Sequence, residues 1–493
     1  MRIIFFFVCF LYSYSSAIGA GEFVLSNQII SAYSDATRFD LIASRHALDI
    51  DRKSNPGNGF AYLIANYADF IQVFVGDDPI EYRQALARRT QRIRNLEVCD
   101  DRSPYKRYCL AEIYIQWTFL RFQQGEQTKA ANDLRKAASL LHENNRLFPS
   151  FILNKKGLAI IHILAGSIPD NMQWLAKLAG ISGSVNQGIE ELNFVLNWAR
   201  SGKEFQFIIP ELLFFKQLLS IQLLDDKAIR LISQTSDSLF AKEPLLKYVD
   251  IIHAQKSQNA LLVIELIDHF PKSITGVKLC FLDYLKAEAR MNLELSDQNG
   301  FRQFIQCSAG KHFKQAAIRK IAWQNLLLGK PREYFNYMES IKLLGKPTTE
   351  EDKQAVIEAN TGKVPDLILL KSRLLFDGGQ AGIAINDLLK IELKNRDIIF
   401  LSERAYRLGR CYHWLGNENE ALKWYEITIQ KGELLSEYFA ASASYQTGKI
   451  LTQQKRFKEA KEAFLRVSQF PEHPYKGSID AKAKTALKQL KSN

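Results

Sequence analysis

The chain has 493 residues, more than one compact core usually organises, so several domains or an extended repeat array are expected. Its composition is 47% hydrophobic with only 13 prolines and 26 glycines, which excludes a disordered chain and disfavours an all-β fold. The formal net charge of +12 comes from 65 basic and 53 acidic residues spread along the whole length. Such a charge favours acidic partners, but without a basic stripe interleaved with aromatics it argues against nucleic acid.

The first residues resemble a secretion signal. Arg2 precedes an apolar stretch over residues 3–12, which is followed by small residues at 15–20. This order is typical of a secretory signal peptide, and the apolar run is too short to span a bilayer. Cys9 lacks the preceding small residue that a lipoprotein signal needs. We therefore predict a signal peptide over residues 1–20 and an exported protein, periplasmic or outer-membrane-associated, that is soluble rather than lipidated.

Residues 21–197 are predicted to form helical repeats, and they contain the first two of the five cysteines that follow the signal. Cys99 and Cys109 flank a polar turn over residues 100–107. A disulfide between them would be possible in an oxidising compartment. The alternative is two separate buried thiols, because a free cysteine packs as a small hydrophobic residue.

Residues 198–300 fit the repeat pattern poorly, and we expect degenerate helical hairpins there. The apolar segment 205–224 is the only later candidate for a membrane span. It contains Pro210, Glu211 and Lys216, which would be costly in lipid. A buried repeat helix explains this segment better.

Residues 301–493 carry the clearest repeats. The reference unit consists of Gly409, Tyr412, Gly416, Ala421 and Tyr425. The same register begins again at Ser372, 37 residues earlier, and at Gly448, 39 residues later. Its small residues belong where the two helices of a hairpin cross closely, and its second glycine ends the first helix. Spacings near the roughly 34 residues of a tetratricopeptide unit predict stacked helix hairpins.

The last helix is expected to close the array. From residue 478 onward Ile479, Ala483 and Leu487 form one apolar stripe, while lysines occupy the other faces. A stacked array needs such a terminal helix, apolar inside and polar outside.

These residues resemble the tetratricopeptide repeat (TPR) superfamily, most specifically over residues 366–491. Segments 374–379, 406–410 and 473–480 are similar to predicted exported TPR proteins of Bacteroidetes-type bacteria. The resemblance implies an all-α fold, a right-handed solenoid of antiparallel helix hairpins. The bacterial group carries no established activity that could be transferred to this chain.

The motifs of common enzymes are missing from the sequence. It contains no HExxH, GxSxG, GxGxxG or phosphate-binding glycine loop, and its eight histidines lack the i, i+4 pairing of a helical metal site. The acidic triplet at 350–352 is better explained as a capped helix start than as a cation site. We predict no cofactor, no metal and no catalysis. An enzyme that lacks any known motif is kept as a further alternative.

One group of residues suggests a binding groove. In a TPR array the residue after each small position faces the concave groove, and here these residues would form a basic ladder. The ladder comprises Arg373, Arg410 and Lys449, with Tyr406 and Tyr445 one helical turn earlier and His413 one turn later. Positive charge beside aromatic rings suits a protein or peptide partner that is acidic or bears carboxylates. The alternative is solvated charge on an exposed helix face.

The sequence therefore predicts a non-catalytic scaffold that holds a protein or peptide in its concave groove. The alternative function is a glycan-binding accessory protein of an outer-membrane uptake system, because TPR helices also underlie starch-utilisation-type lipoproteins. Those proteins carry a lipidated cysteine and large non-helical insertions, and neither is evident here.

Overall fold

The computed structural model describes residues 22–168, 173–223, 239, 242–272 and 274–490. The predicted signal peptide lies outside the described residues. Helices follow one another along the whole described chain, and the only extended pairing within it is a single bridge between Asp40 and Thr275. The all-α fold expected from the sequence is confirmed.

The described residues of the first half, 22–168 and 173–223, fold into ten α-helices and one short 3-10 turn. They are α1 (Asn27–Thr37), α2 (Leu41–Ser54), α3 (Gly59–Gly76), α4 (Pro79–Glu97), α5 (Pro104–Gln123), α6 (Gln127–Leu147), α7 (Asn154–Ser167), α8 (Gln173–Ala179), α9 (Val185–Ser201), η2 (Gln206–Ile208) and α10 (Ile209–Leu223). Local capping sets several starts: the Asp78 side chain accepts from the amide of Ile80, and Pro79 follows as the first residue of α4.

The second half continues with shorter helices. They are α12 (Pro244–Lys256), α13 (Ala260–Asp268), α14 (Cys280–Asn292), α15 (Gln298–Cys307), α16 (Lys314–Leu327), α17 (Pro331–Lys342), α18 (Glu350–Thr361), α19 (Leu367–Asp377), α20 (Ala381–Leu389), α21 (Ile398–Trp414), α22 (Glu418–Gly432), α23 (Phe439–Gln453), α24 (Phe457–Val467) and α25 (Lys476–Leu490). A capping box between Thr349 and Asp352 starts α18, which confirms the interpretation of the acidic triplet as a helix start.

Most helices pair as hairpins, and the first helix of each hairpin also contacts the first helix of the next. This second set of contacts joins α1, α3, α5, α7 and α10 in the first half, and α14, α16, α19, α21, α23 and α25 in the second. We call the side formed by these first helices the inner face. Helix α18 does not belong to a two-helix hairpin, because it packs on both helices of the α16–α17 hairpin. The arrangement is the expected solenoid of antiparallel helix hairpins.

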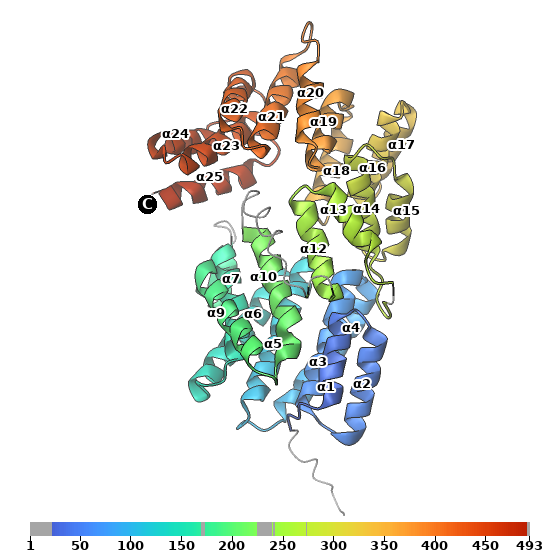
Figure 1. Cartoon of the computed structure of the whole chain (residues 1–493), viewed down its shortest axis with the longest axis vertical. Helices are drawn as coiled ribbons and strands as arrows, with labels where there is room; N and C mark the ends of the chain where they lie inside the picture. Colours follow the sequence, from blue (N-terminus) through green and yellow to red (C-terminus); the bar gives the residue numbers. More distant parts are fainter. Residues whose placement is uncertain (1–21, 169–172, 224–238, 240–241, 273, 491–493) are drawn as a thin grey trace, which may run out of the picture.

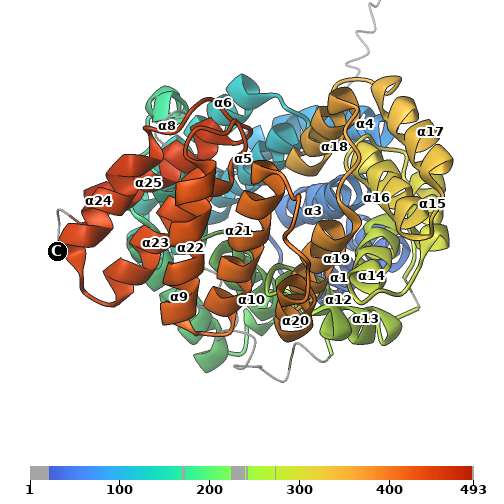
Figure 2. The same cartoon turned by 90° about the horizontal axis from the view of Figure 1, so that it is seen from above.

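The solenoid turns back on itself, and its second tier lies on its first (Figures 1 and 2). The Thr275 hydroxyl donates to the Asp40 carboxylate, and the His312 backbone amide donates to the Asp77 carboxylate at 3.3 Å. Both contacts join residues 235 positions apart. One superhelical turn therefore takes about 235 residues, several hairpins of the repeat length.

The small positions of the repeat lie where the sequence pattern predicts close helix crossing. A Cβ atom added at Gly409 would stand 2.6 Å from the ring of Tyr425, and one added at Gly448 would stand 2.5 Å from the ring of Phe464. The same glycine–aromatic contact thus recurs in two successive hairpins, α21–α22 and α23–α24. At the end of the array α25 packs on α23 and α24, so the expected capping helix is confirmed.

The disulfide does not form where the sequence suggested. Cys99 and Cys109 are two free, buried thiols, and the Cys99 sulfur points back to the carbonyl oxygen of Asn95 at 3.5 Å. The described bridge joins Cys280 to Cys307, with their Cα atoms 5.7 Å apart. These residues are the first of α14 and the last of α15, which an antiparallel hairpin brings together. The alternative of separate buried thiols holds for the first pair.

The apolar segment 205–224 contributes η2 and α10 to the hairpin stack. Among the described residues no helix is both long and apolar enough to cross a bilayer. One buried apolar cluster runs from Ile29 to Leu374 across the expected divisions after residues 197 and 300. Those domain divisions stay predictions.

Candidate functional site

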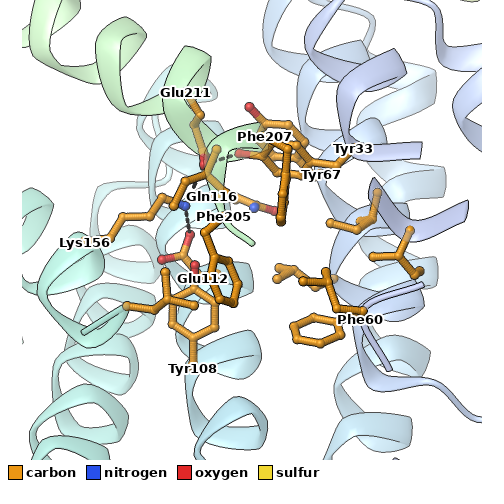
Figure 3. A pocket seen from close by; sticks show the side chains of 16 residues that line it. Tyr33, Phe60, Tyr67, Tyr108, Glu112, Gln116, Lys156, Phe205, Phe207 and Glu211 are labelled. Carbon is orange, nitrogen blue, oxygen red and sulfur yellow. Dashed lines mark hydrogen bonds and ion pairs between the residues drawn. The ribbon is translucent and has the colours of Figure 1, made fainter. Parts of the chain in front are cut away.

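The inner face of the first half encloses a small cavity of about 40 Å³ (Figure 3). Its walls come from α1, α3, α5, α7, η2 and α10 and are mainly aromatic. The rings belong to Tyr33, Phe60, Tyr67, Tyr108, Phe205 and Phe207. A space of this size holds one or two water molecules and is far below the roughly 300 Å³ of ordinary ligand pockets.

Three charged side chains meet at the wall of this cavity (Figure 3). The Lys156 ammonium from α7 lies 2.8 Å from the Glu112 carboxylate on α5 and 2.7 Å from the Glu211 carboxylate on α10. The Lys156 side chain is only 4% exposed. The Tyr33 hydroxyl on α1 donates to Glu211, so the cluster ties four of the inner helices together.

The electrostatics of the cluster are unbalanced. Burial raises the pKa of Glu112, and the nearby ammonium only partly opposes this shift. For Lys156 burial lowers the pKa, but the two carboxylates outweigh it and hold the pKa well above its usual value. The second oxygen of Glu112, Oε1, is buried and has no hydrogen-bond partner. Two carboxylates share one ammonium, and we interpret the group as a structural cluster that closes the inner face.

The chain's own N-terminal segment also fills this part of the inner face. The Asn58 side chain accepts from the Val24 amide at 3.1 Å and donates to the Val24 carbonyl at 2.8 Å. The Phe23 ring packs against Phe60 and occupies the space that a side chain at position 59 would need. A partner therefore has little room on the first half of the inner face, which directs attention to the second half.

Two of the predicted groove residues lie on aromatic rings of that second half. The Arg373 guanidinium on α19 stands 5.1 Å from the centre of the Trp323 ring on α16, and its side chain is 37% exposed. The Arg410 guanidinium on α21 stands 5.1 Å from the Phe376 ring on α19. Each arginine thus stacks on the preceding first helix, a cation–π geometry that the sequence pattern did not indicate.

Tyr406 has a different role from the one expected. It is only 5% exposed, and its hydroxyl shares a 2.8 Å hydrogen bond with Ser442 of α23. It also accepts a 3.4 Å hydrogen bond from the Arg410 guanidinium. The ring is therefore a packing residue that positions Arg410 and is closed to a partner.

The other three predicted residues lie nearer the surface. Tyr445 is half-buried, with its ring 5.8 Å from Phe464, and Lys449 is half-buried on the same helix, α23. The His413 Nδ1 atom lies 3.3 Å from the Tyr425 hydroxyl, so this imidazole also supports the hairpin packing.

Acidic side chains accompany some arginines on the helices of the predicted ladder, and the basic ladder itself stays a prediction. Arg373 stands 3.8 Å from Asp377, and Arg407 pairs with Glu403, one helical turn away in each case. The acids occupy positions that the repeat pattern did not single out. A partner would need to compete with these acids for the arginines.

Sequence reasoning also missed aromatic residues that converge here. The Tyr438 ring at the start of α23 lies 5.1 Å from the Tyr475 ring, which precedes α25. The Trp323 ring carries a second guanidinium, that of Arg319, at 4.6 Å. Arg319 and Trp323 lie one helical turn apart on α16, whereas Tyr438 and Tyr475 meet only because α25 packs on α23.

The described residues contain no group of three or more histidine, cysteine or acidic side chains that could hold a metal ion. The acidic triplet at the start of α18 serves helix ends instead. The Asp352 carboxylate accepts from the backbone amides of Phe313 at 2.9 Å and Ala316 at 3.0 Å, and so caps α16 as well.

Comparisons with known proteins add little to this description. No protein-family model matches the chain, and no curated protein matches it either. Among solved structures, the TPR domain of P58(IPK) aligns at 13% identity over 92% of this chain and 95% of that chain, with a TM-score of 0.21. A circular tandem repeat protein with a novel repeat topology aligns at 12% identity over 94% of both chains, with a TM-score of 0.13. TM-scores this low carry no argument, so the TPR-like architecture rests on the hairpin packing itself.

Proposed function

We propose that this protein is a non-catalytic scaffold that binds a protein or peptide through the second half of its inner face. The observation that carries the proposal is the pair of partly exposed arginines stacked on aromatic rings one repeat apart, Arg373 on Trp323 and Arg410 on Phe376. The first half of the inner face is filled by its own side chains, so the second half offers the accessible surface.

The chemistry of these stacked arginines favours an extended peptide with carboxylate groups. A guanidinium held flat on a ring keeps its N–H edges free to form paired hydrogen bonds with a carboxylate. The pairing of Arg373 with Asp377 then disfavours neutral ligands, because a ligand must bring its own anionic group to replace the carboxylate that it displaces. Binding would require no covalent chemistry.

The proposed location is the periplasm or the outer-membrane surface. The prediction rests on residues 1–20, whose sequence has the features of a secretory signal. The disulfide between Cys280 and Cys307 supports it, because such bonds persist mainly in oxidising compartments.

The test is a charge reversal of the basic ladder. The triple variant Arg373→Glu, Arg410→Glu and Lys449→Glu is compared with the unchanged protein on arrays of acidic peptides and of glycans. We expect binding to acidic peptides, weakened in the triple variant by at least about tenfold, the loss expected from two charged hydrogen bonds. Circular dichroism checks that helicity is unchanged.

A matched control variant reverses three basic charges outside the proposed groove. Lys353→Glu, Lys423→Glu and Arg456→Glu alter exposed residues that each pair with an acid three residues away, and Arg456 also donates to Gln454. This control should bind peptides as the unchanged protein does. If the ladder variant binds as well as the control, the proposed groove is wrong. Binding confined to the glycan array would favour the uptake-accessory alternative instead.

A further inference from the structure

A polar cleft opens between α2 and α4, on the side of α3 that faces away from the cavity of Figure 3. Its volume is about 420 Å³, within the range of ordinary ligand pockets. Helix α3 forms its floor, and α2 and α4 form its walls. The polar lining residues are Arg45, Asp49 and Arg52 on α2, Asp69 and Gln72 on α3, and Glu81, Gln84, Arg88 and Arg92 on α4.

A buried carboxylate organises the arginines of this cleft. Asp69 is only 3% exposed, and it accepts from Arg88 through Nε at 2.7 Å and Nη2 at 3.0 Å. The same carboxylate accepts from Arg92 at 2.7 Å, and the Arg45 guanidinium lies 3.7 Å away. Three guanidinium groups from two helices are therefore held around one point.

Asp69 does not take up all the donors of these arginines, although Arg45 also donates to Gln72 and Arg88 lies 3.6 Å from Glu81. A guanidinium has five N–H donors, and Asp69 can accept only part of the set that three such groups present. Arg52, on the α2 wall, adds a fourth guanidinium that pairs with the exposed carboxylate of Asp49. With Glu81 as the third acid, four arginines face three carboxylates, so the cleft keeps a positive charge.

We propose that this cleft binds a phosphate group carried by a small molecule or a lipid headgroup. A planar carboxylate matches one guanidinium fork, which is how Arg88 holds Asp69, and Arg92 adds one more donor to it. A phosphate presents three oxygens in different directions, and these suit donors that converge from both walls. Asp69 would act as a positioning residue that holds Arg88 and Arg92 in place before the ligand arrives.

A second basic depression on the protein lacks the buried carboxylate that organises this cleft. Between α15 and α17, Arg302, Lys330 and Arg332 line a more open depression of about 610 Å³. No buried carboxylate is among the residues that line it. This depression is also basic but has no buried carboxylate to organise its side chains, so it serves as the internal control.

The experiment measures pyrophosphate binding by calorimetry at physiological salt. The variant Arg45→Gln with Arg52→Gln removes two partly exposed side chains, 45% and 49% exposed, and leaves the contacts of Arg88 and Arg92 with the buried carboxylate intact. We expect its affinity to fall by about tenfold or more, since charged hydrogen bonds are lost. Unchanged melting temperature verifies its fold.

The control variant Arg302→Gln with Arg332→Gln removes equal charge from the other depression, and its affinity should change less than about twofold. Vesicles of phosphatidylglycerol, compared with phosphatidylcholine, form a second arm that separates a lipid source from a free phosphate compound. Loss of binding only in the Arg45/Arg52 variant, in either arm, supports the proposal. No binding in both arms, or equal loss in the two variants, overturns it and leaves the cleft as an ion-pair network.

Discussion

Replacement of Lys156 by methionine should destabilise the first half of the solenoid strongly. The ammonium lies 2.8 Å from Glu112 and 2.7 Å from Glu211, and all three side chains are almost fully buried. Its removal leaves two carboxylates facing each other without a cation. Breaking a buried ion pair in this way costs about 3–5 kcal/mol, a large fraction of the roughly 5–15 kcal/mol that stabilises a typical domain.

The two glutamates of the cluster should respond differently to neutralisation. Glu211 accepts from both Tyr33 and Lys156, so Glu211→Gln should cost about 1–3 kcal/mol. The Oε1 atom of Glu112 has no partner, and burial already raises the pKa of this carboxyl. Glu112→Gln should therefore cost less than about 1 kcal/mol, because Glu211 still pairs with Lys156 and the cluster loses its excess negative charge.

The raised pKa of Glu112 also predicts a dependence on pH. The folded state holds this proton more tightly than the unfolded state, so its contribution to stability falls as pH rises above the usual glutamate value of about 4.5. That slope should disappear in Glu112→Gln. Hydrogen exchange of amides in α5 and α7 measures the local free energy of opening for each variant. The reasoning is refuted if Glu112→Gln costs as much as Glu211→Gln, or if Lys156→Met is nearly neutral.

Two further predictions concern the hairpins and the contact between tiers. Gly409→Ala should lower the free energy of unfolding by about 1–3 kcal/mol, because the added methyl group overpacks against Tyr425. The control Gly382→Ala, with open space around it, should not lower it. Equal melting temperatures of the two variants would contradict this prediction. Burial lowers the pKa of His312, but its 2.6 Å contact with Asp77 outweighs this and raises it, so the stabilisation should be lost as pH rises above about 6.5. Melting curves between pH 6 and 9 should show that loss in the unchanged protein, and His312→Gln should remove it.

The helix hairpins could be predicted from the sequence because their packing is local. Gly409 and Tyr425 lie 16 residues apart, and both positions recur in the next hairpin as Gly448 and Phe464. The start of α18 was also predictable, since a capping box involves only four neighbouring residues. Each of these features depends on contacts within one hairpin, so a single sequence contains them in full.

The candidate groove was predicted only in part. Arg373 and Arg410 do face first helices of the preceding hairpins, but the rings beneath them, Trp323 and Phe376, come from other repeats. Tyr406 was expected to be accessible and is buried, because α23 brings Ser442 against its hydroxyl. The repeat pattern predicts which side of its helix a residue occupies. It does not predict which side chains of the neighbouring hairpin contact that residue.

The sequence by itself thus determined the hairpins, their small crossing positions and the closing helix. Only the tertiary structure decided that the first half of the inner face is filled, through a contact between Tyr33 and Glu211 that spans 178 residues. It also decided the stacking of the two tiers, where Asp77 meets His312 after 235 residues. The physical reason is that the curvature of a solenoid is the sum of small rotations between neighbouring hairpins, and no local pattern records that sum.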